Sequence, residues 1–156
     1  MNLNNFYNAW EDGVTHLNIH PNSKFKHVRQ LTDLAKNELI HPVHGKFCSM
    51  RGLIYYLVTS NENMRNKYGY DLEKGVVAKD KRKKINKARV FKECVNILIK
   101  DSPEFRDAIF TTFKAGLPIA GYRYSGTTYV LNIYHKELVK YYIELKKKWE
   151  AGHALY

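Results

Sequence analysis

The chain has 156 residues, with 26 Lys or Arg against 15 Asp or Glu, which gives a formal net charge of +11. This length is typical of one domain, and a chain of this size buries enough surface to fold without disulfides or structural metals. An apolar fraction of 44% excludes wholesale disorder, and the longest apolar run, residues 53–58, is far too short to span a membrane. We therefore expect a single domain over residues 1–156 with no membrane partner.

Two further features favour a cytoplasmic location. Residues 1–6 lack the basic and apolar regions of a secretory signal. The two cysteines, Cys48 and Cys94, lie within apolar patterns and form no CxxC motif. We expect both to be buried, reduced thiols without a redox or nucleophilic role.

The first half of the chain predicts short elements. Residues 14–20 alternate in polarity as a short strand does, and a proline follows them. Apolar spacing predicts helices over about 23–36 and 49–60, each capped by its first residue, a serine. Between them, residues 41–47 are typical of a turn leading into an extended segment. A shorter helix is expected over 61–68.

The second half is mainly helical by pattern. Apolar residues recur at helical spacing over about 85–100. A Ser-Pro-Glu sequence then begins a helix over 102–115, because the serine caps it, proline suits its first turn and the acid suits its dipole; Gly116 ends it. A Tyr-rich stretch at 121–134, interrupted by Ser-Gly, predicts a hairpin, and 136–151 predicts a closing helix. The fold class is therefore α+β, mostly helical with a few short strands.

Much of the excess positive charge lies in one stretch. This stretch, between Lys79 and Lys92, indicates either a solvated surface or a binding site for a polyanion, such as nucleic acid or nucleotide phosphates. The cations are Lys79, Lys81, Arg82, Lys83, Lys84, Lys87, Arg89 and Lys92.

The histidine pairs do not predict a metal site. His16 and His20 are expected on a strand, where this spacing does not bring two side chains together, and His41 and His44 flank a proline turn. The chain also lacks a P-loop and a dinucleotide-binding glycine motif. We therefore expect no metal and no cofactor.

The twelve tyrosines are more informative. Most are expected to pack their rings into the core with the hydroxyl toward the surface. Aromatic faces beside cations also hold the base and phosphates of a nucleotide. The candidates for such contacts are Arg51, Arg65, Tyr68, Arg123 and Tyr124.

Four segments, in the same order, resemble the NADAR family in the branch found in bacteriophages. Residues 39–56, LIHPVHGKFCSMRGLIYY, resemble its G-x-F-x-S-x-E-G pattern at the entry to an aromatic helix. Three further matches follow, and together they cover about residues 18–132. They are Met64-Arg65 with Tyr68-Gly69, the pair of segments Phe91–Glu93 and Asp101–Arg106, and Leu117-Pro118 with Gly121–Tyr124.

The resemblance implies an N-glycosidase fold that acts on ADP-ribose-type or riboflavin-precursor N-glycosides; some members remove ADP-ribose from modified guanine in DNA. It also implies an anionic nucleotide as partner. The ligand-binding residues expected on this basis and from the aromatics are Lys46, Phe47, Ser49, Arg51, Tyr55, Arg65, Tyr68, Tyr122, Arg123 and Tyr124.

The sequence departs from the family at two positions. The family's glutamate falls on Arg51, and its upstream S-N-F element falls on residues 32–34. Cleavage of an N-glycosidic bond builds positive charge on the ribose, which a carboxylate stabilises and a guanidinium repels. A guanidinium suits a phosphate instead. The weak candidates for a replacement carboxylate are Asp33, Asp71 and Glu73.

Three functions follow as alternatives. In the first, a phage-encoded protein in the infected host cell sequesters an ADP-ribose-derived or cyclic nucleotide immune signal without hydrolysing it. In the second, an active N-glycosidase uses a displaced carboxylate on an ADP-ribosyl or related N-glycoside, including ADP-ribosylated guanine. In the third, the basic stretch between Lys79 and Lys92 binds nucleic acid or a host protein. The first is the leading hypothesis.

Overall fold

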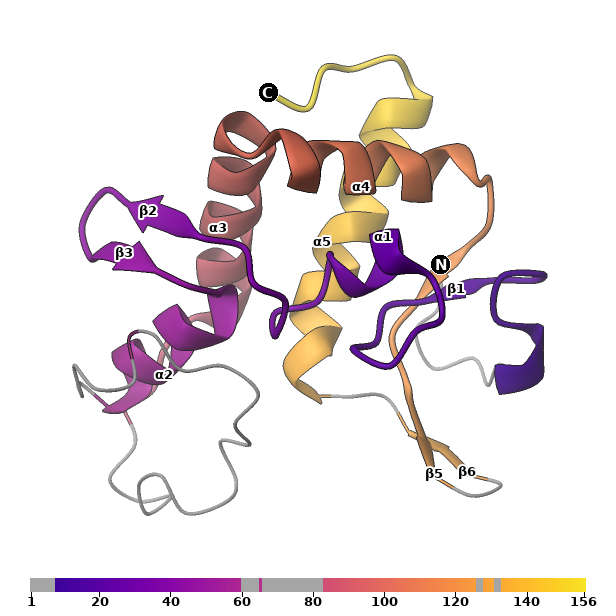
Figure 1. Cartoon of the computed structure of the whole chain (residues 1–156), viewed down its shortest axis with the longest axis horizontal. Helices are drawn as coiled ribbons and strands as arrows, with labels where there is room; N and C mark the ends of the chain where they lie inside the picture. Colours follow the sequence, from indigo (N-terminus) through magenta and orange to yellow (C-terminus); the bar gives the residue numbers. More distant parts are fainter. Residues whose placement is uncertain (1–7, 60–64, 66–82, 126–127, 131–132) are drawn as a thin grey trace.

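The computed structural model describes residues 8–59, 65, 83–125, 128–130 and 133–156, with side-chain environments given outside 123–135. These residues form a mostly helical α+β fold in which short strands accompany five α-helices (Figure 1). The helices are α1 (Lys26–Arg29), α2 (Met50–Thr59), α3 (Lys87–Asp101), α4 (Pro103–Lys114) and α5 (Ile133–Glu150). The strands are β1 (Leu17–Asn18), β2 (Leu39–His41), β3 (Gly45–Phe47), β4 (Ile119–Ala120), β5 (Arg123–Ser125) and β6 (Thr128–Val130).

The three longest helices surround the core. Helix α3 packs against both α5 and α4, and α4 crosses the upper ends of the other two in Figure 1. Their facing side chains are apolar and almost fully buried, so hydrophobic burial stabilises this arrangement. The central members are Phe91, Val95, Ile99, Phe105, Phe113, Leu138 and Tyr142. No helix in the described part of the chain is long and apolar enough to cross a membrane.

Local caps set the ends of α3 and α4, and the sequence predicted the Ser102 cap but not the Asn86 cap. The Asn86 side chain accepts a hydrogen bond from the amide of Arg89 at 3.1 Å and begins α3. The Ser102 amide ends α3 by donating to the carbonyl of Leu98 at 2.8 Å. The Ser102 hydroxyl then accepts from the amide of Phe105 at 3.3 Å and begins α4. The predicted helix pair is therefore confirmed.

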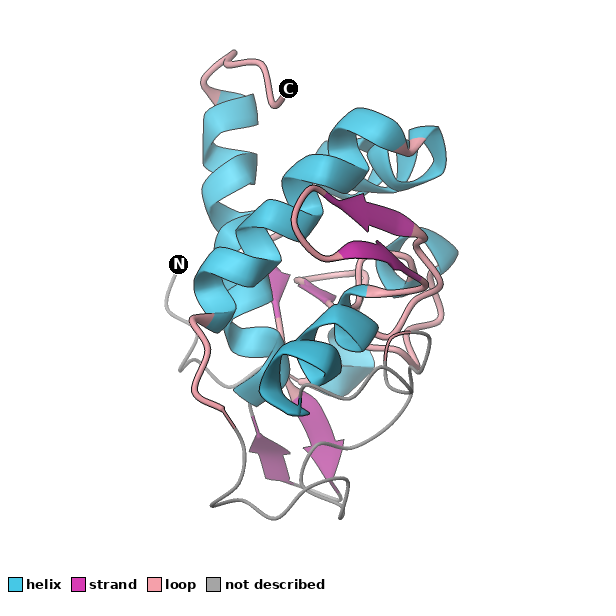
Figure 2. Cartoon of the chain, turned by 90° about the vertical axis from the view of Figure 1, so that its left-hand side faces the viewer, coloured by secondary structure: helices cyan, strands magenta, loops and turns pink. Residues whose placement is uncertain are grey.

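The strands form three separate two-stranded sheets (Figure 2). The predicted hairpin is confirmed as the antiparallel pair β5–β6. Strands β1 and β4 pair in parallel and bring the segment after α4 to the N-terminal part of the fold. The turn and extended segment predicted at 41–47 are part of a hairpin, in which β3 pairs antiparallel with β2. Gly45 has a φ of +84° at this turn, a conformation that favours glycine.

Several predicted boundaries are wrong. The helix expected over 23–36 is only the four residues of α1, and the following residues form turns. Thr32 donates its hydroxyl and its amide to the carbonyl of Arg29, at 2.8 and 3.2 Å, which replaces the helical ladder. The strand expected over 14–20 is only β1, and α5 begins three residues before the predicted position 136. The helix predicted over 61–68 lies outside the described residues except for Arg65.

The double role of Ser102 gives a testable prediction. Ser102→Ala removes the oxygen that caps α4, and we expect it to lower the free energy of unfolding by about 1 kcal/mol in urea denaturation. Ser102→Asp keeps an acceptor at this position and should unfold close to the wild type. Equal losses in both variants would contradict the capping role.

Candidate functional site

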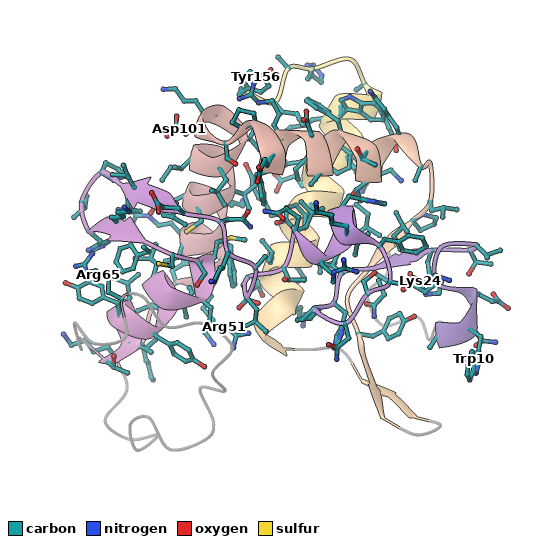
Figure 3. The ribbon with its side chains drawn as sticks, viewed as in Figure 1. Trp10, Lys24, Arg51, Arg65, Asp101 and Tyr156 are labelled. Carbon is teal, nitrogen blue, oxygen red and sulfur yellow. The ribbon has the colours of Figure 1, made fainter. Side chains whose placement is uncertain are left out.

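Arg51, one of the ligand-binding residues expected from the sequence, lies in the core. It is the second residue of α2, whose first turn is capped by the Ser49 hydroxyl accepting from the amide of Gly52 at 3.0 Å. The Arg51 side chain is 6% exposed, and its Nε donates to the carboxylate of Asp33, which is 1% exposed. The Arg51 amide also donates to the Asp33 carbonyl at 3.0 Å. Figure 3 shows Arg51 at the beginning of α2.

The electrostatics of this pair follow from its burial. Burial opposes the charge of Arg51, but the charge and hydrogen bond of Asp33 outweigh it, with a smaller contribution from Tyr55, so the pKa of Arg51 is raised. Its guanidinium carbon lies 5.8 Å from the centre of the Tyr55 ring. Burial, followed by the charge of Asp33, raises the pKa of Tyr142, whose hydroxyl donates to the carbonyl of Leu31 at 2.7 Å. The pair is therefore a permanent ion pair inside the fold.

This pairing affects the two roles expected from the sequence, Asp33 as a catalytic carboxylate and Arg51 as a phosphate-binding residue. A carboxylate held by a guanidinium is a weak base, so Asp33 in this arrangement is a poor replacement for a catalytic glutamate. The charge of Arg51 is balanced by Asp33 rather than presented to an anion at the surface. Arg51 and Asp33 together form a structural element.

A cavity of about 360 Å³ lies on the other side of the segment that carries Asp33. One part of its lining is polar and includes two exposed cations, a hydroxyl and a side-chain amide, while the rest is apolar. The lining residues are Lys26, Arg29, Gln30 and Thr32 together with Pro21, Leu34 and Ala35.

Neighbouring contacts hold the polar residues in place. Lys26 and Arg29 are three residues apart on α1, so their side chains project from the same side of the helix. Arg29 Nη1 donates to the carbonyl of Ser23 at 2.7 Å. The buried Asn37 donates to the Gln30 carbonyl at 2.8 Å and accepts from the Gln30 side chain. The Thr32 hydroxyl, the Gln30 side chain and Arg29 Nη1 all donate within the protein, so the lining groups that remain for a ligand are the Lys26 ammonium and the other N–H groups of Arg29, beside an apolar surface of the kind found in small-molecule sites.

The candidates Lys46 and Phe47 of the β2–β3 hairpin, and Arg65 beside them, do not line this cavity. The Arg65 guanidinium is 4.4 Å from the centre of the buried Phe47 ring and 4.6 Å from that of Tyr56, and it donates to the carbonyl of His44. Lys46 is exposed and lies 3.3 Å from Glu38. Arg65 therefore ties the hairpin to α2 through stacking and backbone contacts.

Two histidines serve internal contacts. His16 Nε2 lies 2.6 Å from the hydroxyl of Tyr122, and both residues are buried. His41 Nε2 lies 2.8 Å from Glu93, and its Nδ1 accepts from the amides at the hairpin turn. Of the remaining candidates, Arg123 and Tyr124 lie on β5 with side chains outside the description, and Tyr68, Asp71 and Glu73 lie outside the described residues.

The basic stretch is described only from Lys83 onward. Arg89 Nε lies 3.0 Å from Glu93, and Lys92 lies 3.7 Å from Glu144 of α5. These two cations are partly neutralised by acids on the same surface, which weakens the case for a continuous polyanion site there. Lys79, Lys81 and Arg82 lie outside the described residues.

The sequence analysis missed the cations of the cavity. Lys26 and Arg29 fall within the helix predicted over 23–36, and the sequence analysis gave them no role. The signal that separates them from other surface cations is the turn at Thr32, which ends α1 and brings Leu34 beside them.

Comparison of the chain with protein-family models, with curated proteins and with solved structures finds no match.

The buried ion pair predicts an asymmetric response to mutation. Asp33→Ala leaves the Arg51 charge buried without its carboxylate, and we expect a loss of about 3–5 kcal/mol in the free energy of unfolding. Replacing both residues, as Asp33→Leu with Arg51→Met, should cost far less, because no charge is left in the core. Urea denaturation of the wild type, of Asp33→Leu and Arg51→Met singly and of the double variant measures the coupling energy between the two residues. Additive single losses would contradict the pairing.

His16 predicts a pH dependence of stability. Burial lowers its pKa despite the nearby carboxylates of Asp12 and Glu11. The unfolded chain therefore binds the proton more readily, so this contribution to stability is complete above about pH 6.5 and is lost as the pH falls through the lowered pKa. We expect the free energy of unfolding to rise with pH up to about 6.5, and to rise less in His16→Gln. An unchanged slope in the variant would refute this assignment.

Proposed function

We propose that this protein binds an anionic nucleotide in the cavity beside α1 and holds it without hydrolysis. The observation that carries the proposal is the pairing of Lys26 and Arg29 with an apolar surface in one cavity of about 360 Å³. This volume lies within the range of about 300–1,000 Å³ typical of small-molecule sites. The formal net charge of +11 also favours the approach of an anion.

Each part of a nucleotide has a counterpart in the lining. The guanidinium of Arg29, whose Nη1 donates to the Ser23 carbonyl, has further planar N–H donors for phosphate oxygens, and the ammonium of Lys26 adds a second positive charge. Pro21, Leu34 and Ala35 provide an apolar surface for a base or ribose. The cavity therefore suits a ligand that is anionic at one end and flat and weakly polar at the other.

The lack of an available carboxylate near the cavity supports binding without hydrolysis. None of the described residues that line it is acidic, and the nearest carboxylate in sequence, Asp33, is held by Arg51 on the opposite side of the wall. Strong binding of the ground state without a group that stabilises the transition state gives retention rather than turnover. The resemblance to the NADAR family suggests ADP-ribose-derived nucleotides as ligands, and its phage branch suggests capture of a host immune signal.

The N-glycosidase alternative requires a carboxylate near the ribose, and Asp71 and Glu73 lie outside the described residues. The nucleic-acid alternative has less support, because Arg89 and Lys92 lie beside acids. Sequestration is therefore the leading proposal.

The cavity cations give the first test. We expect the wild-type protein to bind ADP-ribose in calorimetric titration, and Lys26→Ala and Arg29→Ala each to weaken binding about tenfold, because each removes a charge-assisted contact with the phosphates. The double variant should lose measurable binding.

The matched control is Lys148→Ala, which removes one exposed cation from α5 and leaves the cavity intact. It should bind ADP-ribose with wild-type affinity. If Lys148→Ala weakens binding as much as the cavity variants do, the attraction comes from net charge alone and the assigned site is wrong.

A further inference from the structure

The wall of the cavity has two chemically different sides. Thr32, Leu34 and Ala35 line the cavity, whereas the side chain between them, Asp33, is turned into the core. Because these residues are consecutive, any displacement of Asp33 also displaces the lining residues on either side of it. The position of the wall is therefore set by what holds Asp33.

Arg51 holds Asp33 at two points. Its Nε donates to the Asp33 carboxylate, and its backbone amide donates to the Asp33 carbonyl at 3.0 Å. One residue at the beginning of α2 thus fixes both the side chain and the main chain of Asp33. Tyr142 of α5 adds a third contact by donating to the carbonyl of Leu31 at 2.7 Å.

These contacts are important for the position of the wall because the wall is not part of a helix or sheet. Residues 30–35 form turns in which the amides of Leu31, Thr32 and Ala35 donate to carbonyls three residues earlier, and the contacts from Arg51 and Tyr142 join these turns to the rest of the core. A wall of this kind must be ordered before or during ligand binding, and an ordering cost paid on binding weakens affinity. Contacts that order it in the free protein remove that cost.

We propose that Arg51 is a positioning residue of the cavity, which fixes the wall through Asp33 rather than touching the ligand. This inference rests on the proposed function for its effect on affinity, but its effect on the wall does not require a ligand. It assigns to Arg51 a role different from the phosphate contact that its sequence position suggests. Replacing the pair is expected to change the position of the wall more than the stability of the fold, since an apolar pair of similar volume is often as stable.

The test uses the double variant Arg51→Met with Asp33→Leu in the full chain. We expect its urea midpoint to stay near that of the wild type and amide hydrogen exchange over residues 30–36 to become faster. Affinity for ADP-ribose should fall about tenfold. The dependence of the affinity on salt concentration should keep the wild-type slope, because no phosphate contact is lost, whereas Arg29→Ala should reduce that slope.

Two further variants keep the test decisive. Arg51→Lys retains a charge beside Asp33 but not the planar guanidinium, so its exchange rate and affinity should lie between those of the wild type and the double variant; it replaces the double variant if that chain fails to fold. Tyr141→Phe removes a buried hydroxyl that donates to Asn96 away from the cavity, and should change neither the exchange of the wall nor the affinity.

The outcomes separate the two proposals. Unchanged exchange over residues 30–36 in both Arg51 variants overturns the positioning role, as does a reduced salt slope, which would place Arg51 in contact with the ligand. If the wild type fails to bind ADP-ribose while exchange of the wall still rises in the variants, the proposed function fails and the positioning of the wall stands.

Discussion

A charge in a protein core must be paired, and the ion pair of Arg51 and Asp33 is the contact that determines where the segment after α1 lies. It joins the first turn of α2 to the irregular segment after α1, and no strand pairing connects these two segments. Tyr142 of α5 donates to the same segment at the carbonyl of Leu31. Three elements therefore meet where hydrophobic packing alone would leave their relative positions weakly specified.

The same segment connects this constraint to function. Asp33 is buried beside Arg51, and its neighbours line the cavity: the buried Thr32 and the half-buried Leu34 and Ala35. In the proposed function, the cations on α1 would bind the phosphates and the apolar lining would contact a base or ribose. Under the proposed function, the ion pair would keep the Asp33 carboxylate away from the ligand and order the wall, and both effects would favour retention of a nucleotide over its cleavage.

Local chemistry was predictable from the sequence, and long-range placement was not. Ser102 caps a helix through atoms within a few residues, and the Ser-Gly interruption marks the β5–β6 hairpin for the same reason. The end of α1 was missed because Leu31 and Leu34 keep helical spacing whether or not the helix continues. The pairing of Arg51 with Asp33 spans 18 residues and depends on how α2 packs, which no local pattern encodes.

The most direct test of the account is the chemical state of a nucleotide recovered from the protein. The purified chain would be incubated separately with ADP-ribose and with NAD, freed of unbound ligand, heated and analysed by mass spectrometry. The account predicts that ADP-ribose is retained at one molecule per chain and released intact. Release of free nicotinamide or free adenine, in amounts exceeding the protein, would contradict sequestration and identify a working N-glycosidase.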